Sequence, residues 1–120
     1  MKLFESELRV MEVLWSEGEL PARQVAERLA ETAGWNVNTT YTVIKKCVAK
    51  GAVERLEPNF RCRALVSREQ VQRDETERLV DRLFGGAPEQ LFAALLGGKK
   101  LSSEQADRLR ELVAEAEAGR

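Results

Sequence analysis

Within its first 66 residues, the chain changes the spacing of its apolar side chains once, from the period of a helix to that of a strand. Three segments before Gly51 repeat apolar residues every three or four positions, which predicts amphipathic helices. Two short segments after Gly51 alternate apolar and polar residues, which predicts strands. Three helices followed by a two-stranded hairpin form a winged helix-turn-helix. We therefore expect a mainly α-helical protein whose residues 1–66 form a winged helix.

Glycine and proline mark the ends of the predicted helices. A glycine follows each helix, as is common where helices stop. Pro21 stands in the first turn of the second helix, where proline is tolerated. Asn36 is a favourable N-cap for the third. The helices are expected at about residues 5–16, 21–33 and 36–51.

The third predicted helix, from Asn36 to Gly51, has two chemically different faces. Val37, Ile44 and Cys47 belong to a core face, together with Val48. Short polar side chains on the opposite face can bond to base edges in a DNA groove. Lysines one turn further on can reach phosphates. This polar stripe consists of Asn38, Thr39, Thr42, Lys45 and Lys46.

Some residues near this helix have competing interpretations. Asn36 is expected to cap the helix rather than to bind DNA. Tyr41 either packs against the following hairpin or reaches DNA, and the sequence favours neither. Trp15 and Trp35 are expected as core anchors rather than as ligand platforms.

The predicted hairpin, or wing, consists of strands at residues 52–57 and 60–66, joined by a turn at residues 58–59. In the second strand Arg61 and Arg63 alternate with apolar or small residues, so both guanidinium groups share one face. There they could grip the DNA backbone or a minor groove. The candidate DNA-binding residues are Asn38, Thr39, Tyr41, Thr42, Lys45, Lys46, Arg61 and Arg63.

The charge distribution is more informative than the net charge, which is only −1. Residues 36–63 contain six Lys or Arg residues and two Glu residues, which gives this segment a net charge of +4. The rest of the chain therefore has a net charge of −5. A basic patch on an acidic body could hold a phosphate backbone. Most such patches are nevertheless solvated surface.

The composition excludes several function classes. The chain has no histidine, and its only cysteines are Cys47 and Cys62. Zinc sites of Cys and His need about four ligands, and His-based catalysis is excluded, so we expect no enzyme, no metal and no cofactor. Both cysteines are expected to face inward as small hydrophobes. Because no run of about 18 apolar residues and no signal peptide is present, we expect a cytoplasmic protein without membrane insertion.

The remaining residues, 67–120, are expected to form a helical dimerisation domain. Helices are predicted at about 68–84, 88–96 and 103–118, the first and last preceded by capping boxes. They offer too little material for an independent core. Their apolar stripes would pack against a second copy of the chain, or alternatively against the winged helix of the same chain. The candidate dimerisation residues are Leu79, Leu83, Leu91, Phe92, Leu95, Leu109, Leu112 and Val113.

Several segments together resemble the penicillinase-repressor family of the BlaI/MecI/CopY type. The stretch from Trp35 to Thr42 is similar to the Trp-Ser-Pro-Asn-Thr-Val-Tyr-Thr stretch of that family. The resemblance extends over nearly the whole chain, through the segment Glu7 to Trp15, the pairs Lys45-Lys46 and Lys50-Gly51, and the landmarks Gly85-Gly86 and Leu101-Ser102.

The resemblance implies a homodimeric transcriptional repressor on a palindromic operator. It places Asn38, Thr39, Tyr41, Thr42 and Lys46 toward the DNA groove. It also implies a possible partner, a membrane sensor protease that releases DNA by cleaving the repressor. The alternative is a winged helix that binds another protein without reading DNA sequence.

This sequence departs from the family at several positions. Val37 replaces a proline and Cys62 an aromatic residue, and Ala94-Leu95 stands near the position of the cleaved Asn-Phe bond. No cysteine follows Cys62, so copper sensing of the CopY kind is not implied. The signal that would release DNA is therefore not given by the sequence.

Overall fold

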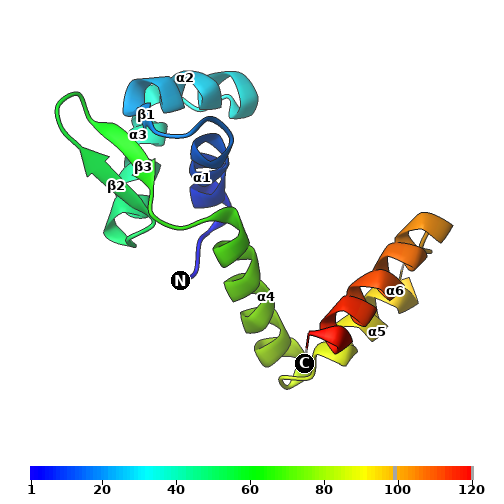
Figure 1. Cartoon of the computed structure of the whole chain (residues 1–120). Helices are drawn as coiled ribbons and strands as arrows, with labels where there is room; N and C mark the ends of the chain where they lie inside the picture. Colours follow the sequence, from blue (N-terminus) through cyan, green and yellow to red (C-terminus); the bar gives the residue numbers. More distant parts are fainter. Residues whose placement is uncertain (99, 120) are drawn as a thin grey trace. The chain divides into compact units, whose positions relative to one another are not determined.

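The computed structural model describes residues 1–98 and 100–119 (Figure 1). Two compact units are present, Met1–Thr76 and Glu77–Arg120, called here the N-terminal and C-terminal units. The division falls inside one helix, ten residues beyond the 66/67 position expected from the sequence. The elements in chain order are α1 Glu5–Glu17, β1 Leu20–Pro21, α2 Ala22–Ala33, α3 Val37–Ala49, β2 Val53–Leu56, β3 Arg61–Ala64, α4 Arg68–Phe84, α5 Pro88–Gly98 and α6 Ser103–Ala118.

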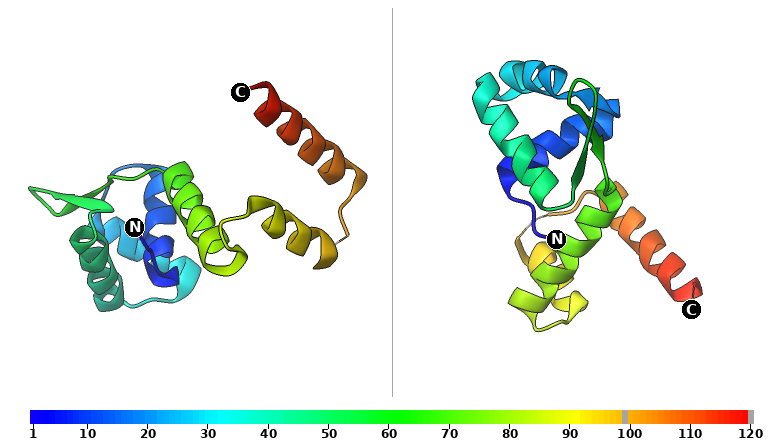
Figure 2. Two further views of the ribbon diagram at one scale, coloured as in Figure 1. Left: turned by 90° about the horizontal axis from the view of Figure 1, so that it is seen from below. Right: turned by 90° about the vertical axis from the view of Figure 1, so that its left-hand side faces the viewer.

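The N-terminal unit is a winged helix, as predicted. Helices α1, α2 and α3 pack together, with the β2–β3 hairpin at their edge (Figures 1 and 2). The prediction of a two-stranded wing was incomplete, because the antiparallel sheet has three strands in the order β1-β3-β2. Leu20 pairs with Cys62, and Pro21 with Arg61. A strand of two residues is too short to show alternation, and proline is tolerated at a sheet edge.

The wing strands are shorter than expected. Asn59 and Phe60 have φ angles of 71° and 45°, so both belong to the turn and β3 begins at Arg61. In the register of the hairpin, Glu54 lies opposite Arg63, and Arg55 lies opposite Cys62. Because opposed residues share a face, Arg55 is on the side of the sheet that Cys62 turns toward the core.

The core of the N-terminal unit lies between the three helices and the sheet. Cys47 and Cys62 are completely buried, which confirms their inward orientation. Burial raises the pKa of Cys47 to about 12 and that of Cys62 to about 11, so both stay protonated thiols. The buried residues that form one apolar cluster are Leu3, Val10, Met11, Leu14, Ala22, Val25, Leu29, Val43, Ile44, Cys47, Ala52, Val53, Cys62 and Val71.

One assignment to this core was wrong. Val37 was expected on the core face of α3, but its side chain is 54% exposed. It is the first residue of the helix and lies one turn before the core begins at Thr40. Trp15 and Trp35 pack against the core and are only partly buried, in agreement with their expected role.

An ion pair with a buried carboxylate connects α1 to the end of α3. Glu7 of α1 is 1% exposed, and its Oε1 atom accepts hydrogen bonds from Lys50 Nζ at 2.6 Å and from the backbone N–H of Phe4 at 2.7 Å. Lys50 also donates to the Lys2 carbonyl oxygen at 2.8 Å and lies 4.1 Å from the centre of the Phe4 ring. Burial alone would raise the pKa of Glu7, but the Lys50 and Phe4 hydrogen bonds hold it below its usual value.

The C-terminal unit contains the end of α4 and the helices α5 and α6. Among their described residues, α5 and α6 have no buried side chain. Helix α6 begins with a capping box, in which Ser102 and Gln105 exchange two hydrogen bonds of 3.0 and 3.1 Å. Helix α5 ends at Gly98, two residues later than predicted. Within the part of the chain described, no helix combines the length and apolar character of a membrane span.

Candidate nucleic-acid interface

Helix α3 presents a polar face to solvent above a buried face. The cap expected at its start is confirmed, because Asn36 Oδ1 accepts a hydrogen bond from the Thr39 backbone N–H at 2.8 Å. The buried face consists of Thr40, Val43 and Ile44, together with the sulfur of Cys47. Every residue of the predicted polar stripe is exposed: Asn38, Thr39, Thr42, Lys45 and Lys46.

The lysines of this stripe are available for anions. Lys45 and Lys46 are exposed on α3, and no ion pair to either is found among the described residues. Their ammonium groups are thus solvated charges beside the short polar side chains of the same helix. Among the described residues, no carboxylate is in direct contact with either lysine, and Lys46 interacts with Glu7 only at longer range.

The other cations of the predicted basic patch are paired within the chain. Lys50 is held by Glu7 as described above, and Arg55 Nε lies 2.6 Å from Glu57. The patch is therefore weaker than the local charge of +4 suggested. Four of its six cations, Lys50, Arg55, Arg61 and Arg63, form ion pairs with glutamates. Among the described residues, the other two cations, Lys45 and Lys46 on α3, have no such ion pair.

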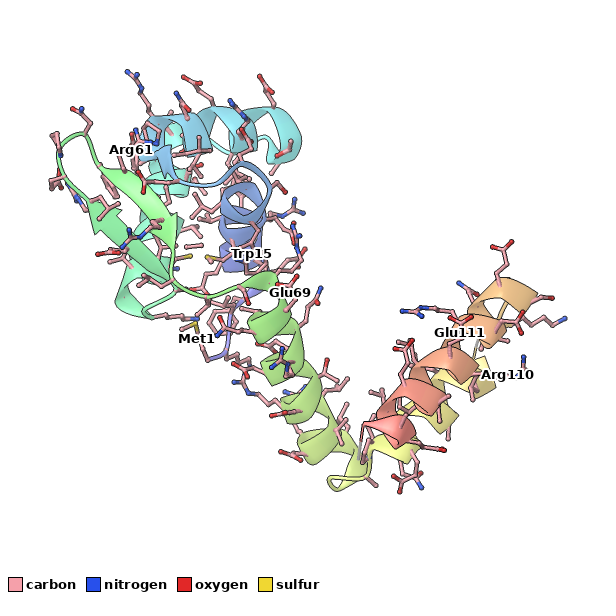
Figure 3. All side chains as sticks on the ribbon, in the orientation of Figure 1. Met1, Trp15, Arg61, Glu69, Arg110 and Glu111 are labelled. Atoms are coloured by element: carbon pink, nitrogen blue, oxygen red, sulfur yellow. The ribbon has the colours of Figure 1, made fainter. Side chains whose placement is uncertain are left out.

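The wing arginines Arg61 and Arg63 share one face, as predicted, but neither is a free cation. Arg61, labelled in Figure 3, has its Nε atom 2.8 Å from Glu19. Arg63 is in close contact with Glu54. Both pairs are partly exposed to solvent. Exposed ion pairs of this kind contribute about 0–1 kcal/mol, so a phosphate oxygen can replace the carboxylate at little cost.

Contacts between aromatic rings and a guanidinium group join α3 to the wing. Tyr41 lies 5.8 Å from Phe60 between ring centres, which favours the interpretation that it packs against the wing. The guanidinium of Arg55 lies 3.8 Å from the centre of the Phe60 ring. Arg55 was absent from the candidate residues. The alternation that starts at the buried Val53 could have placed it on the α3 side of the sheet.

The start of α2 is fixed beside the same turn. The backbone N–H of Ala22 donates to the Phe60 carbonyl oxygen at 2.8 Å. The next residue, Arg23, is exposed, and it was not among the candidates either.

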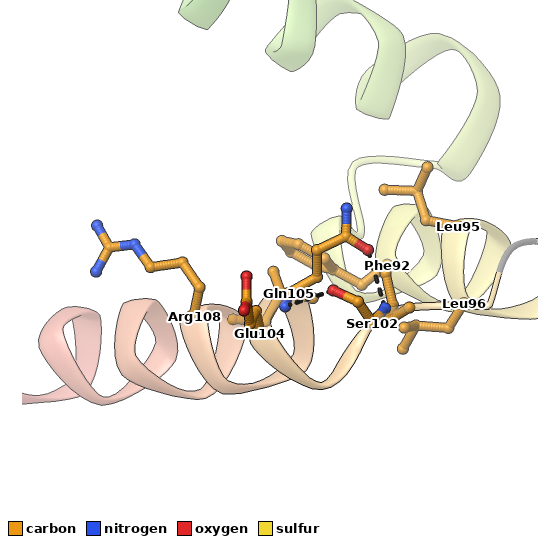
Figure 4. A pocket seen from close by; sticks show the side chains of 9 residues that line it. Phe92, Leu95, Leu96, Ser102, Glu104, Gln105 and Arg108 are labelled. Atoms are coloured by element: carbon orange, nitrogen blue, oxygen red, sulfur yellow. Dashed lines mark hydrogen bonds between the residues drawn. The ribbon is translucent and has the colours of Figure 1, made fainter.

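Three of the candidate dimerisation residues, Phe92, Leu95 and Leu109, line an open apolar groove within the C-terminal unit. Phe92, Leu95 and Leu96 of α5, labelled in Figure 4, line this groove together with Leu101 and Leu109, and its volume is about 640 Å³. The exposed fractions of Leu83, Phe92, Leu95, Leu112 and Val113 lie between 43% and 61%, whereas Leu79, Leu91 and Leu109 are half-buried.

Three comparisons relate this architecture to known proteins. The model of the penicillinase repressor family matches residues 3–115. An uncharacterized 16.5 kDa protein in the ptsI 3′ region of Latilactobacillus sakei is 29% identical over 110 residues, which cover 90% of this chain and 75% of that protein. The solution structure of the DNA-binding domain of the repressor BlaI matches with a TM-score of 0.52 and 23% identity, over 56% of this chain and 84% of that one.

The comparisons agree with the architecture described above. The BlaI match supports the winged-helix fold. The family match extends through both units, from the start of the winged helix into α6. This chain therefore belongs to the penicillinase repressor family.

Proposed function

We propose that this protein is a transcriptional repressor that binds a pseudo-palindromic operator as a homodimer, with α3 in the major groove. A DNA-binding repressor is the function that family and fold support. The observation that carries the proposal is the exposed polar stripe of α3, laid over a fully buried face inside a winged helix.

The chemistry of α3 suits the major groove. That groove is about 12 Å wide and admits one α-helix. Asn38 and Thr42 offer donors and acceptors that can distinguish base edges, while Lys45 and Lys46 can neutralise phosphates on either side. The N-terminal turn of α3, where Asn38 and Thr39 lie, would be the part that enters deepest.

The wing would act on the flanking backbone. Arg61 and Arg63 would exchange their carboxylate partners for phosphates, because both pairs are solvent-exposed. The Arg55 guanidinium, stacked on Phe60, already lies on the α3 side of the sheet. These residues would set affinity and orientation rather than sequence preference.

The homodimer is supported by the apolar surface of α5 and α6. Since none of their described residues is buried in the single chain, side chains such as Phe92, Leu95 and Val113 need a covering partner. A second copy supplies an identical surface through a two-fold axis. Such a dimer presents two copies of α3, which matches a two-fold operator.

Release of DNA by proteolysis stays a prediction drawn from the family resemblance, and the inducing signal is unknown. The Ala94–Leu95 bond, near the position expected for cleavage, lies inside helix α5. A protease cutting there would need the helix to open, because proteolysis favours exposed, unpaired backbone. A sensor protease as partner is therefore compatible with this site only if α5 opens locally.

The proposal is tested by DNA binding and by molecular mass in solution. If the two lysines of each protomer contact phosphates, a dimer neutralises at least about four, and log K falls with log salt with a slope near −3.6 or steeper. Affinity would drop about 100-fold between 50 and 200 mM salt. Sedimentation equilibrium should give twice the 13.5 kDa chain mass. A flat salt dependence, or a stable monomer, would contradict the proposal.

A further inference from the structure

The arginines of the wing are paired with glutamates of the same chain. On the face of β3 that carries Arg61 and Arg63, Arg61 Nε lies 2.8 Å from Glu19 Oε2, and Arg63 contacts Glu54. The four side chains are 36–52% exposed, so solvent reaches both pairs. A phosphate oxygen that approached these guanidinium groups would meet two carboxylates already bound to them.

The register of the sheet brings both carboxylates to these arginines. Glu54 of β2 lies directly opposite Arg63 of β3, so their side chains leave the sheet on the same face. Glu19 comes directly before β1, and the pairing of Pro21 with Arg61 holds that segment along β3. Each pair is therefore positioned by the backbone of the sheet as well as by the attraction between its charges.

A third pair lies on the other face of the wing. Arg55 Nε is 2.6 Å from Glu57 Oε1, and the guanidinium group lies over the Phe60 ring. The hydrogen bond from Arg55 lowers the pKa of the Glu57 carboxyl from its usual value, so this group is a carboxylate in neutral solution. In contrast, Lys45 and Lys46 on α3 have no ion pair among the described residues. The cations of the wing are thus neutralised within the chain, and those of α3 are not.

A carboxylate and a phosphate compete for the same guanidinium group, because both bind it through oxygen acceptors. We propose that Glu19 and Glu54 are internal competitors of DNA phosphates at Arg61 and Arg63, and that they weaken the binding of every DNA sequence alike. The inference rests on the proposed function, in which the wing lies against the DNA backbone. Because backbone contacts carry no sequence information, this competition lowers affinity without changing the preference for the operator.

The size of the effect follows from the exposure of the pairs. An exposed ion pair changes an equilibrium by up to about fivefold. A dimer presents two copies of each pair, so one kind of pair weakens DNA binding by up to about 25-fold. Salt screens exposed charges, so the weakening is largest in dilute salt and fades as the salt concentration rises.

The test measures the affinities of full-length Glu19→Gln and Glu54→Gln for a duplex of random sequence and for the operator selected by the wild-type protein. Each substitution keeps the shape of the side chain and removes its negative charge. Glu12→Gln is the matched control, because it removes the same charge from an exposed pair with Arg68 at 2.8 Å, outside α3 and the wing. Arg61→Gln, alone and combined with Glu19→Gln, completes a double-mutant cycle.

Both glutamate substitutions in the wing should strengthen DNA binding. At about 50 mM salt, Glu19→Gln and Glu54→Gln should each bind random DNA at least about threefold more tightly than Glu12→Gln, and the operator by the same factor. The gain should shrink toward about 200 mM salt. When Arg61 is already glutamine, Glu19→Gln should change affinity no more than Glu12→Gln does, because the competition needs the arginine.

Three results would overturn the inference alone. Weaker binding by Glu19→Gln and Glu54→Gln would mean that the glutamates orient the arginines for DNA. A gain no larger than that of Glu12→Gln, or a gain from Glu19→Gln that persists without Arg61, would mean that only the net charge matters. If the wild-type protein bound neither duplex at about 50 mM salt, the proposed function itself would fail. Thermal unfolding checks each variant first, and if one of the two wing variants does not fold, the other decides the question.

Discussion

Replacing Lys50 with methionine would leave a buried carboxylate without its cation. Methionine keeps most of the length of the lysine stem but has no ammonium group to donate to Glu7 Oε1 or to the Lys2 carbonyl oxygen. Glu7 is 1% exposed, so water cannot replace the lost partner. Of the hydrogen bonds described here, only the one from the Phe4 N–H would still reach the carboxylate.

The structure sets the size of the effect. Breaking a buried ion pair by removing one partner costs about 3–5 kcal/mol, because an uncompensated charge is left inside. The side chain of Lys50 is 29% exposed, which favours the lower end, about 3 kcal/mol. A domain with a typical free energy of unfolding of about 5–15 kcal/mol would stay folded at room temperature, but its thermal unfolding midpoint would be lower than that of the wild type.

The cost should depend on pH with a definite sign. In the wild type the pKa of Glu7 is lowered from 4.5, so the pair contributes fully above that value and its contribution is lost in more acidic solution. In Lys50→Met the lowering contributions of Lys50 are lost while the burial that raises the pKa remains, so the folded-state pKa of Glu7 moves upward from its wild-type position. Protonation then relieves the buried charge, and the stability difference from wild type shrinks as the pH falls from about 7 to about 5.

Urea unfolding followed by circular dichroism at both pH values measures this difference. Lys45→Met is the matched control: it makes the same chemical change at an exposed position of α3 and should cost less than about 0.5 kcal/mol. Adding Glu7→Gln to Lys50→Met should recover part of the loss at neutral pH, because it removes the buried charge. A cost below about 1 kcal/mol at both pH values would refute the reasoning, since that is the behaviour of a surface pair.

Three other substitutions have defined expected outcomes. Asn36→Ala removes the cap of α3 and should lower the free energy of unfolding by about 1 kcal/mol in a denaturant titration, whereas no change would mean that the bond to Thr39 is not a working cap. Lys46→Ala should make the salt slope of DNA binding shallower by about one per protomer, and an unchanged slope would exclude a phosphate contact. Leu109→Asp places a charge beside the α5–α6 groove and should convert the dimer to a monomer in sedimentation, so a persistent dimer would locate the interface elsewhere.

Local signals explain which elements could be predicted from the sequence. The starts of α4 and α6 agree with prediction because each is marked by a capping box, in which Ser67 pairs with Gln70 and Ser102 with Gln105. The polar stripe of α3 was also predictable, since a period of 3.6 residues separates it from the buried face. Strand β1 was not, because its two residues gain their structure only by pairing with β3.

The ion pairs show where the sequence pattern is insufficient. Glu7 and Lys50 are 43 positions apart, and Glu19 and Arg61 are 42 apart. No local spacing connects such residues, so a count of charges treats paired and unpaired cations alike. For the same reason, the local charge of +4 overstated what the region offers to DNA, and the buried position of a glutamate in α1 was not foreseen.

The DNA-reading role of α3 is tested most directly by replacing both Asn38 and Thr42 with alanine. Affinity is measured at one salt concentration for the operator selected by the wild-type protein and for random DNA of the same length. Each lost base contact should cost about 1–3 kcal/mol on the operator and leave random DNA nearly unaffected. Equal losses on the two DNAs, or no loss on either, would contradict the assignment of α3 as the helix that reads sequence.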